Sequence, residues 1–81
     1  MNSVFGSLFI VSTPLGNLKD ITLRALDIMK NSYLIAAEDT RKSQILLKEY
    51  KIKTKMISYH EHNSHNRIKT IIAHLKDGKN I

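Results

Sequence analysis

Three short polar clusters carry most of the side chains in this sequence that could do chemistry. They are residues 13–17 (Thr-Pro-Leu-Gly-Asn), residues 38–41 (Glu-Asp-Thr-Arg) and residues 59–63 (Tyr-His-Glu-His-Asn), and each follows an apolar run. Carboxylates and imidazoles can act as general acids or bases, and a guanidinium can bind a phosphate or a carboxylate through two hydrogen bonds. These clusters are therefore where we expect a functional site.

Each of the first two clusters also has a purely structural interpretation. Gly16 and Asn17 could form only a turn, and because Gly16 stands by itself the loop is not the phosphate-binding pattern G-x-G-x-x-G. Glu38 and Asp39 could simply stabilise the amino terminus of a helix. An adjacent pair of acids followed by an arginine is more than a cap requires, so we predict a functional role, with Arg41 binding a phosphate or a carboxylate.

The third cluster is rich in histidine and raises the question of a metal site. His60, His62 and His65 have the spacing His-x-His-x-x-His, with Glu61 between the first two. On a strand, His60 and His62 would share a face, but the spacing differs from the helical i, i+4 pair of many zinc sites. We predict no metal, and we expect His60 to be a polar residue of the site.

Apolar periodicity predicts the elements that must position these clusters. Strands are expected at about residues 8–12, 33–37 and 55–58. A first helix, capped by Asp20, is expected to run to about residue 31. A second helix, capped by Thr40, should end near Tyr50 and point three apolar side chains inward: Ile45, Leu46 and Leu47.

The third expected helix has the clearest amphipathic pattern. It should be capped by Asn63 or Ser64 and end before Gly78, which stands where a C′ glycine belongs. Its apolar side chains recur at i, i+3, i+4 and i+7, at Ile68, Ile71, Ile72 and Leu75. Asn80 and Ile81 look like the first step of a fourth strand.

Strands that alternate with helices predict an α/β fold with a mostly parallel sheet. In such a sheet the loops that follow the strands lie along one edge, and ligands of open α/β sheets bind at that carboxyl edge. The three polar clusters would therefore meet although about 20 residues separate them in the sequence.

Composition narrows the class of protein further. The 81 residues carry a net charge of +6 and contain no cysteine, so no disulfide framework or thiolate metal site is available. No apolar run approaches the roughly 20 residues that span a bilayer, and the amino terminus lacks a secretory pattern, so we expect a cytoplasmic protein. The charge suggests an anionic partner such as RNA, although ten dispersed lysines can equally form a solvated surface.

The motifs also resemble a known family. Residues 9–26 (Phe-Ile-Val-Ser-Thr-Pro-Leu-Gly-Asn-Leu-Lys-Asp-Ile-Thr-Leu-Arg-Ala-Leu), residues 38–41 and residues 58–63 (Ser-Tyr-His-Glu-His-Asn) resemble, in order and spacing, the amino-terminal signature of the ribosomal RNA small subunit methyltransferase I family. The resemblance covers the chain from Leu8 onward. It identifies the sequence as similar to the tetrapyrrole methylase-like, class III methyltransferases.

This resemblance implies a fold and an activity. The family uses S-adenosylmethionine, has two α/β domains with the cofactor in the cleft between them, and usually forms a homodimer. Its members methylate the ribose 2′-hydroxyl of a cytidine in small-subunit ribosomal RNA. The implied fold is a three-layer α/β sandwich, of which residues 1–81 would be an incomplete amino-terminal part without the second domain.

The sequence departs from the family in its length. Family members continue, after the position of residues 78–81, into a strand that ends in an Asp-Ala-Gly-Thr-Pro type of loop, which contributes the main cofactor contacts. In the family this fourth strand lies between the first and second strands. The resemblance therefore implies that the main cofactor loop lies beyond Ile81.

The resemblance also suggests roles for individual residues. Glu38, Asp39 and His60 are the candidates for catalytic work, including that of general base. Residues that would contact RNA or line the cleft are Pro14, Gly16, Asn17, Arg41, Glu61 and Asn63.

Three other interpretations stay open on the sequence alone. The chain could be a truncated, non-catalytic α/β fragment, because the main cofactor loop is absent. It could be a small basic RNA-binding module, on the strength of its charge. It could also be a methylase of tetrapyrroles on the same fold, although the second and third clusters argue against this.

Overall fold

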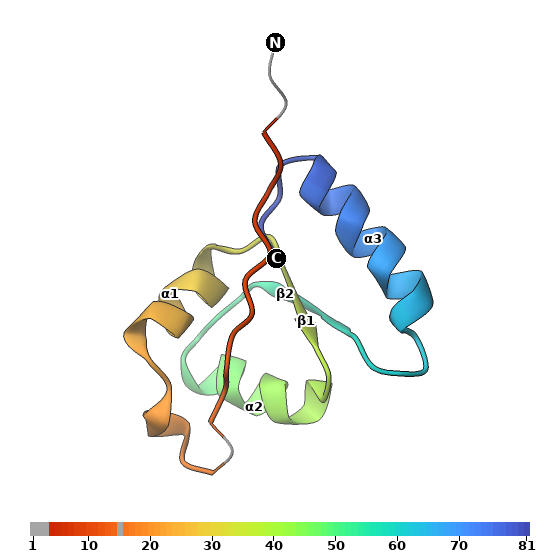
Figure 1. The fold of residues 1–81 in the computed structure, drawn as a ribbon. Coiled ribbons are helices and arrows are strands. Elements are labelled where there is room, and N and C mark those ends of the chain that lie inside the picture. The colour runs from red at the N-terminus through yellow and green to blue at the C-terminus, as the bar shows by residue number, and fades with distance from the viewer. Residues whose placement is uncertain (1–3, 15) are drawn as a thin grey trace.

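A computed structural model of the chain describes residues 4–14 and 16–81 (Figure 1). In chain order its elements are the 3-10 helix η1 (Leu18–Asp20), α1 (Leu23–Asn31), β1 (Leu34–Ala37), α2 (Thr40–Glu49), β2 (Lys55–Ser58) and α3 (Ser64–Lys76). None of the helices in these ranges combines the length and the apolar character needed to cross a lipid bilayer.

The two strands form a parallel sheet connected by α2. Leu34 pairs with Lys55 and Ala37 pairs with Ser58, so both strands end at the same edge. The expected strand at 55–58 is confirmed, and the one at 33–37 begins one residue later. The α/β class with a parallel sheet is therefore confirmed, whereas the three layers of a complete sheet stay a prediction.

Apolar side chains gather on both faces of this sheet, because successive strand residues point to opposite sides. On one face, Ile35 and Met56 pack against a cluster from the turn before α1, α1, α2 and the loop after α2, formed by Ile21, Ala25, Met29, Leu46, Leu47 and Ile52. On the other face, Ala36 and Ile57 pack against a cluster of Leu34, Ile71 and Ile81. Figure 1 accordingly shows α3 on the opposite side of the strands from α1 and α2.

The strand expected at residues 8–12 is absent from the structure. Residues 4–14 are extended, but their backbone pairing with the carboxyl-terminal residues ends at Phe9, whose N–H donates to Ile81 O at 2.8 Å, while Ile81 N–H donates to Ser7 O at 3.0 Å. Beyond Phe9 the segment lacks a neighbouring strand among the described residues, and Ile10 is 89% exposed. A strand cannot form a ladder without that neighbour.

The carboxyl-terminal residues lie between this segment and β1. Tyr33 N–H donates to Asn80 O at 2.9 Å on one side, and Ile81 contacts Ser7 and Phe9 on the other. Asn80 and Ile81 thus occupy the place expected for the first step of a further strand, and Ile81 is buried.

Two of the predicted helix starts are wrong. Asp20 ends η1 instead of capping a helix, and α1 is capped by Thr22, whose Oγ1 accepts a hydrogen bond from Ala25 N–H at 3.0 Å. The second helix is capped by Asp39 in place of Thr40, which is its first helical residue. In both cases several capping residues stand within three positions of each other, and the sequence does not rank them.

Some predicted core positions are exposed. Ile45, Ile68 and Ile72 are 60%, 42% and 45% exposed, whereas Leu46, Leu47 and Ile71 are buried as expected. Consecutive helical residues point about 100° apart, so Ile45, Leu46 and Leu47 cannot all face one core. The two α3 residues stay open because the two-stranded sheet is too narrow to cover the whole apolar face of the helix.

The end of α3 is as predicted. Gly78 has a φ of +83°, the left-handed conformation of a C′ glycine, and its N–H donates to Leu75 O at 3.1 Å. This turn directs residues 79–81 back toward the sheet.

Candidate functional site

The parallel register brings the second and third clusters together at the carboxyl edge of the sheet. Ala37 and Ser58 are the last paired residues, and Tyr59 N–H donates to Ala37 O at 2.7 Å. Glu38 and Tyr59 therefore leave the sheet side by side. The structure places both clusters at the edge where ligands of open α/β sheets bind.

The Asp39 side chain is occupied with capping α2. Its Oδ1 accepts hydrogen bonds from Arg41 N–H at 3.1 Å and Lys42 N–H at 3.4 Å. This arrangement satisfies two of the free donors of the first turn and places a negative charge at the positive end of the helix. Glu38 and Arg41 are exposed and extend into solvent at the same helix start.

A tight turn orders the third cluster. Asn63 Oδ1 accepts a hydrogen bond from His60 N–H at 2.9 Å, and Asn63 N–H donates to His60 O at 3.1 Å. His62 N–H donates to His60 Nδ1 at 3.2 Å, and Asn63 Nδ2 lies 3.3 Å from His60 Nε2. Because a neutral imidazole accepts at one nitrogen at a time, each contact supports one of the two tautomers. Glu61 and His62 are exposed at the tip of the turn.

This turn is anchored to the end of β2 by two half-buried side chains. Asn63 Nδ2 donates to Ser58 Oγ at 2.9 Å, and Arg67 Nε donates to Ser58 O at 3.0 Å. Arg67 was not predicted as a site residue. The sequence does hold a signal for it, because a cation in the first turn of a helix is unfavourable unless it has a partner of its own.

The first cluster lies against the start of α2. Thr13, Pro14 and Gly16 line a cavity of about 390 Å³ together with Lys42 and Ser43. Asn17 Oδ1 accepts a hydrogen bond from Lys19 N–H at 2.9 Å and caps η1. A Cβ added to Gly16 would meet nothing within 4 Å, and Gly16 does not have a positive φ. Gly16 thus leaves open space beside its backbone without a left-handed conformation; Leu15 lies outside the described residues.

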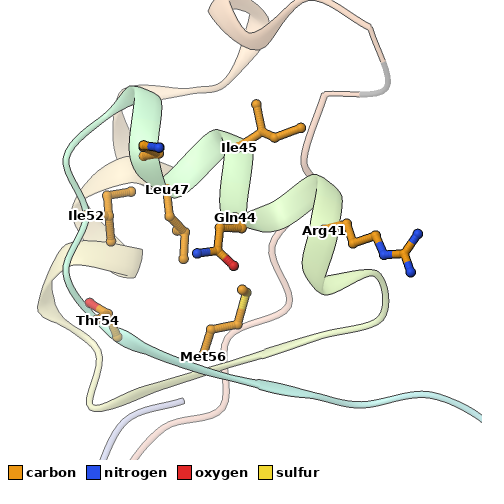
Figure 2. A pocket seen from close by; sticks show the side chains of 8 residues that line it. Arg41, Gln44, Ile45, Leu47, Ile52, Thr54 and Met56 are labelled. Atoms are coloured by element: carbon orange, nitrogen blue, oxygen red, sulfur yellow. The ribbon is translucent and has the colours of Figure 1, made fainter.

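A second cavity, of about 660 Å³, lies between α2 and β2 (Figure 2). Arg41, Gln44, Ile45 and Lys48 of α2 form one side of it, and Met56 of β2 lies opposite. Ile45 lines both cavities and therefore forms the ridge between them.

The described part of the chain contains no cluster of side chains that could form a metal centre. Within residues 4–14 and 16–81 the structure contains no group of three His, Cys, Asp or Glu side chains that could hold a metal ion. His60 and His62 lie edge to face, with ring centroids 5.9 Å apart.

Comparison with known proteins relates this edge to a family. Residues 7–81 match the model of the family described as Tetrapyrrole (Corrin/Porphyrin) Methylases. The chain belongs to the tetrapyrrole methylase family. The carboxyl edge with its three polar clusters is therefore part of a tetrapyrrole methylase domain.

Similar proteins within the family share one name. The chain is 51% identical over 76 residues to a ribosomal RNA small subunit methyltransferase I of Thermotoga maritima, covering 94% of this chain and 34% of that protein. It is 51% identical over 79 residues to the protein of the same name from Bacillus subtilis, covering 98% of this chain and 27% of that protein. The Escherichia coli O157:H7 protein of this name is 46% identical over 94% of the chain. The chain thus spans about a third or less of the length of these relatives.

Proposed function

We propose that this chain contributes the amino-terminal part of an S-adenosylmethionine-dependent methyltransferase that modifies the ribose 2′-hydroxyl of a cytidine in small-subunit ribosomal RNA. The observation that carries the proposal is identity of 51% along 94% of the chain to a relative named for methylation of this RNA. The proposal includes a cytoplasmic location, a homodimer and a second domain outside these 81 residues.

Residues of the first cluster fit one wall of a cofactor site. The cavity beside Pro14 and Gly16 has a volume of about 390 Å³, and small-molecule sites in proteins measure about 300–1,000 Å³. The open space at Gly16 would let a ligand approach the backbone, and Lys42 could hold a carboxylate. Bound there, S-adenosylmethionine would supply an electrophilic methyl group.

The second and third clusters would bind the ribose and take the proton of its 2′-hydroxyl. The reaction requires a positioned 2′-hydroxyl and a base that takes its proton. His60 is a candidate for this role because Asn63 holds its turn at the carboxyl edge of the sheet. Glu38 is the alternative base, and Arg41 would hold an adjacent phosphate.

A chimaeric protein tests this proposal. In it, the chain replaces the segment that it matches in the Bacillus subtilis relative, and tritium transfer from labelled S-adenosylmethionine to small ribosomal subunits is measured. We expect transfer, mapped by nuclease digestion to a 2′-O-methylcytidine. A folded chimaera that binds the cofactor but leaves the RNA unmethylated would contradict the proposal, and methylation of a tetrapyrrole would favour that alternative.

The isolated chain provides a second comparison. The chain spans 34% of the length of the Thermotoga maritima relative and 27% of the Bacillus subtilis relative. We therefore expect the 81 residues alone to show no methyl transfer in the same assay. Transfer by the isolated chain would mean that the three clusters suffice for both cofactor and substrate.

A further inference from the structure

We propose that the groove between α2 and β2 binds single-stranded RNA next to the nucleotide that is modified. The groove is the cavity lined on one side by Arg41, Gln44, Ile45 and Lys48, with Met56 opposite. The inference rests on the proposed function for the identity of the partner, and on the shape and charge of the groove for its location.

One face of α2 supplies the chemistry of the groove. Four of its five lining residues, Arg41, Gln44, Ile45 and Lys48, recur at i, i+3, i+4 and i+7, so they share one side of the helix. Figure 2 shows the Arg41 guanidinium pointing outward at one end, and the Gln44 side chain directed toward Met56 across the groove. Two cations, Arg41 and Lys48, are thus about two helical turns apart along a partly apolar channel.

The charge of the lining favours a polyanion. Among the described residues, the linings of the two cavities contain Arg41, Lys42 and Lys48 and no aspartate or glutamate. Each lysine or arginine that neutralises a phosphate releases counterions, which drives the binding of nucleic acids. The net charge of +6 on the whole chain adds long-range attraction in the same direction.

The apolar part of the lining suits unpaired bases. Ile45 is 60% exposed, and the half-buried Met56 belongs to the lining of the same groove. Proteins that recognise single-stranded RNA stack splayed bases on aromatic side chains or on arginine planes. In this groove Arg41 offers such a plane, and Ile45 and Met56 offer apolar contact beside it. An acidic protein segment would use the cations but would need less of the apolar surface.

The position of the groove links it to the candidate site. Ile45 lines both this groove and the cavity beside Pro14 and Gly16, and Arg41 belongs to the second polar cluster. An RNA strand with its target ribose at the carboxyl edge would therefore reach the groove within a few nucleotides. The groove would hold the flanking nucleotides and so orient the target.

RNA binding by the 81-residue chain tests the inference. The probe is a fluorescein-labelled single-stranded RNA of about 12 nucleotides, followed by anisotropy at several salt concentrations. Ile45→Asp places a carboxylate beside the phosphates and should weaken binding about tenfold or more. Lys48→Gln should lower the slope of log affinity against log salt by about 1.

Matched substitutions on α3 serve as controls. Ile72→Asp makes the same change at another exposed isoleucine, and Lys69→Gln removes an exposed lysine from that helix; both should leave RNA affinity unchanged. Equal affinities for Ile45→Asp and Ile72→Asp would overturn the inference, as would a lack of RNA binding by the unaltered chain. Competition by polyglutamate as effective as that by RNA would assign the groove to an acidic protein and also overturn it.

These results are separate from those that test the proposed function. A chimaera that methylates RNA while Ile45→Asp binds RNA normally would refute the groove alone. RNA binding in the groove by a chain whose chimaera transfers no methyl group would refute the proposed reaction alone.

Discussion

The Asp39 carboxylate is committed to the first turn of α2, and this makes Glu38 the freer acid of the adjacent pair. A carboxylate that accepts two backbone hydrogen bonds has fewer lone pairs left for a ribose hydroxyl. Glu38 is exposed at the same edge and has no such commitment in the capping contacts. At the scale of residues we therefore rank Glu38 above Asp39 as a base.

The cap interpretation gives a stability prediction for Asp39. Asp39→Ala should lower the free energy of unfolding by about 0.5–2 kcal/mol, because two donors of α2 lose their partner. Asp39→Asn should recover most of this loss, and Glu38→Ala should stay within about 0.5 kcal/mol of the unaltered chain. Urea unfolding followed by circular dichroism measures all three, and an unchanged Asp39→Ala would show that the cap contributes nothing.

Arg67 should matter for the third cluster. Arg67→Ala removes the donor to Ser58 O and should cost about 1–3 kcal/mol of stability. Arg67→Lys keeps the charge but lacks the planar fork, so it should recover part of the loss. The control is Lys69→Ala, an exposed position on the same helix. Faster amide exchange at His60 should accompany the loss in Arg67→Ala; equal protection in all variants would contradict an anchoring role.

The clusters can be located from the sequence, but the structural and catalytic roles of the individual residues within them cannot. The order of strand, polar cluster and helix is local information, so residues 38–41 and 59–63 were placed at the sheet edge correctly. The bonds of Asn63 and Arg67 to Ser58 join residues five and nine positions apart across a turn. Such contacts depend on the path of the turn, which composition and periodicity do not specify.

At the scale of elements, the amino-terminal segment is held by a close backbone approach. A Cβ at Gly6 would collide with the backbone carbonyl of Lys79. Gly6 N–H donates to Leu75 O at 2.7 Å, and Ser7 N–H donates to Asn80 Oδ1 at 2.8 Å. No local pattern in the sequence singles out Gly6, because the approach joins residues more than 70 positions apart.

The two loop glycines provide a matched test. Gly6→Ala should displace residues 4–9 from the carboxyl-terminal residues, so the amide protons of Phe9 and Ile81 should exchange faster. Gly16→Ala should leave this protection unchanged, since its Cβ would meet open space. Hydrogen exchange followed by nuclear magnetic resonance makes the comparison, and normal protection in Gly6→Ala would contradict the observed packing.

At the scale of the whole molecule, the described chain holds a two-stranded sheet with apolar clusters on both faces. Exposed apolar residues remain on the extended segment and on α3, at Leu8, Ile10, Ile68 and Ile72. The strand expected at 8–12 and the inward face of α3 failed as predictions for the same reason, which is that both need a wider sheet. The relatives from Thermotoga maritima and Bacillus subtilis are about three to four times longer than the segments that match this chain.

The central claim is that the clusters at the carboxyl edge carry out methyl transfer to RNA, and the turnover number of the chimaera tests it most directly. His60→Ala and Glu38→Gln should each be made, with Glu49→Gln at the exposed end of α2 as the control. If either side chain takes the proton of the ribose hydroxyl, its variant should lose about 10²–10⁴-fold in kcat while keeping its circular dichroism spectrum and its affinity for S-adenosylmethionine. Turnover equal to that of Glu49→Gln in both variants would contradict the claim and remove this edge from the reaction.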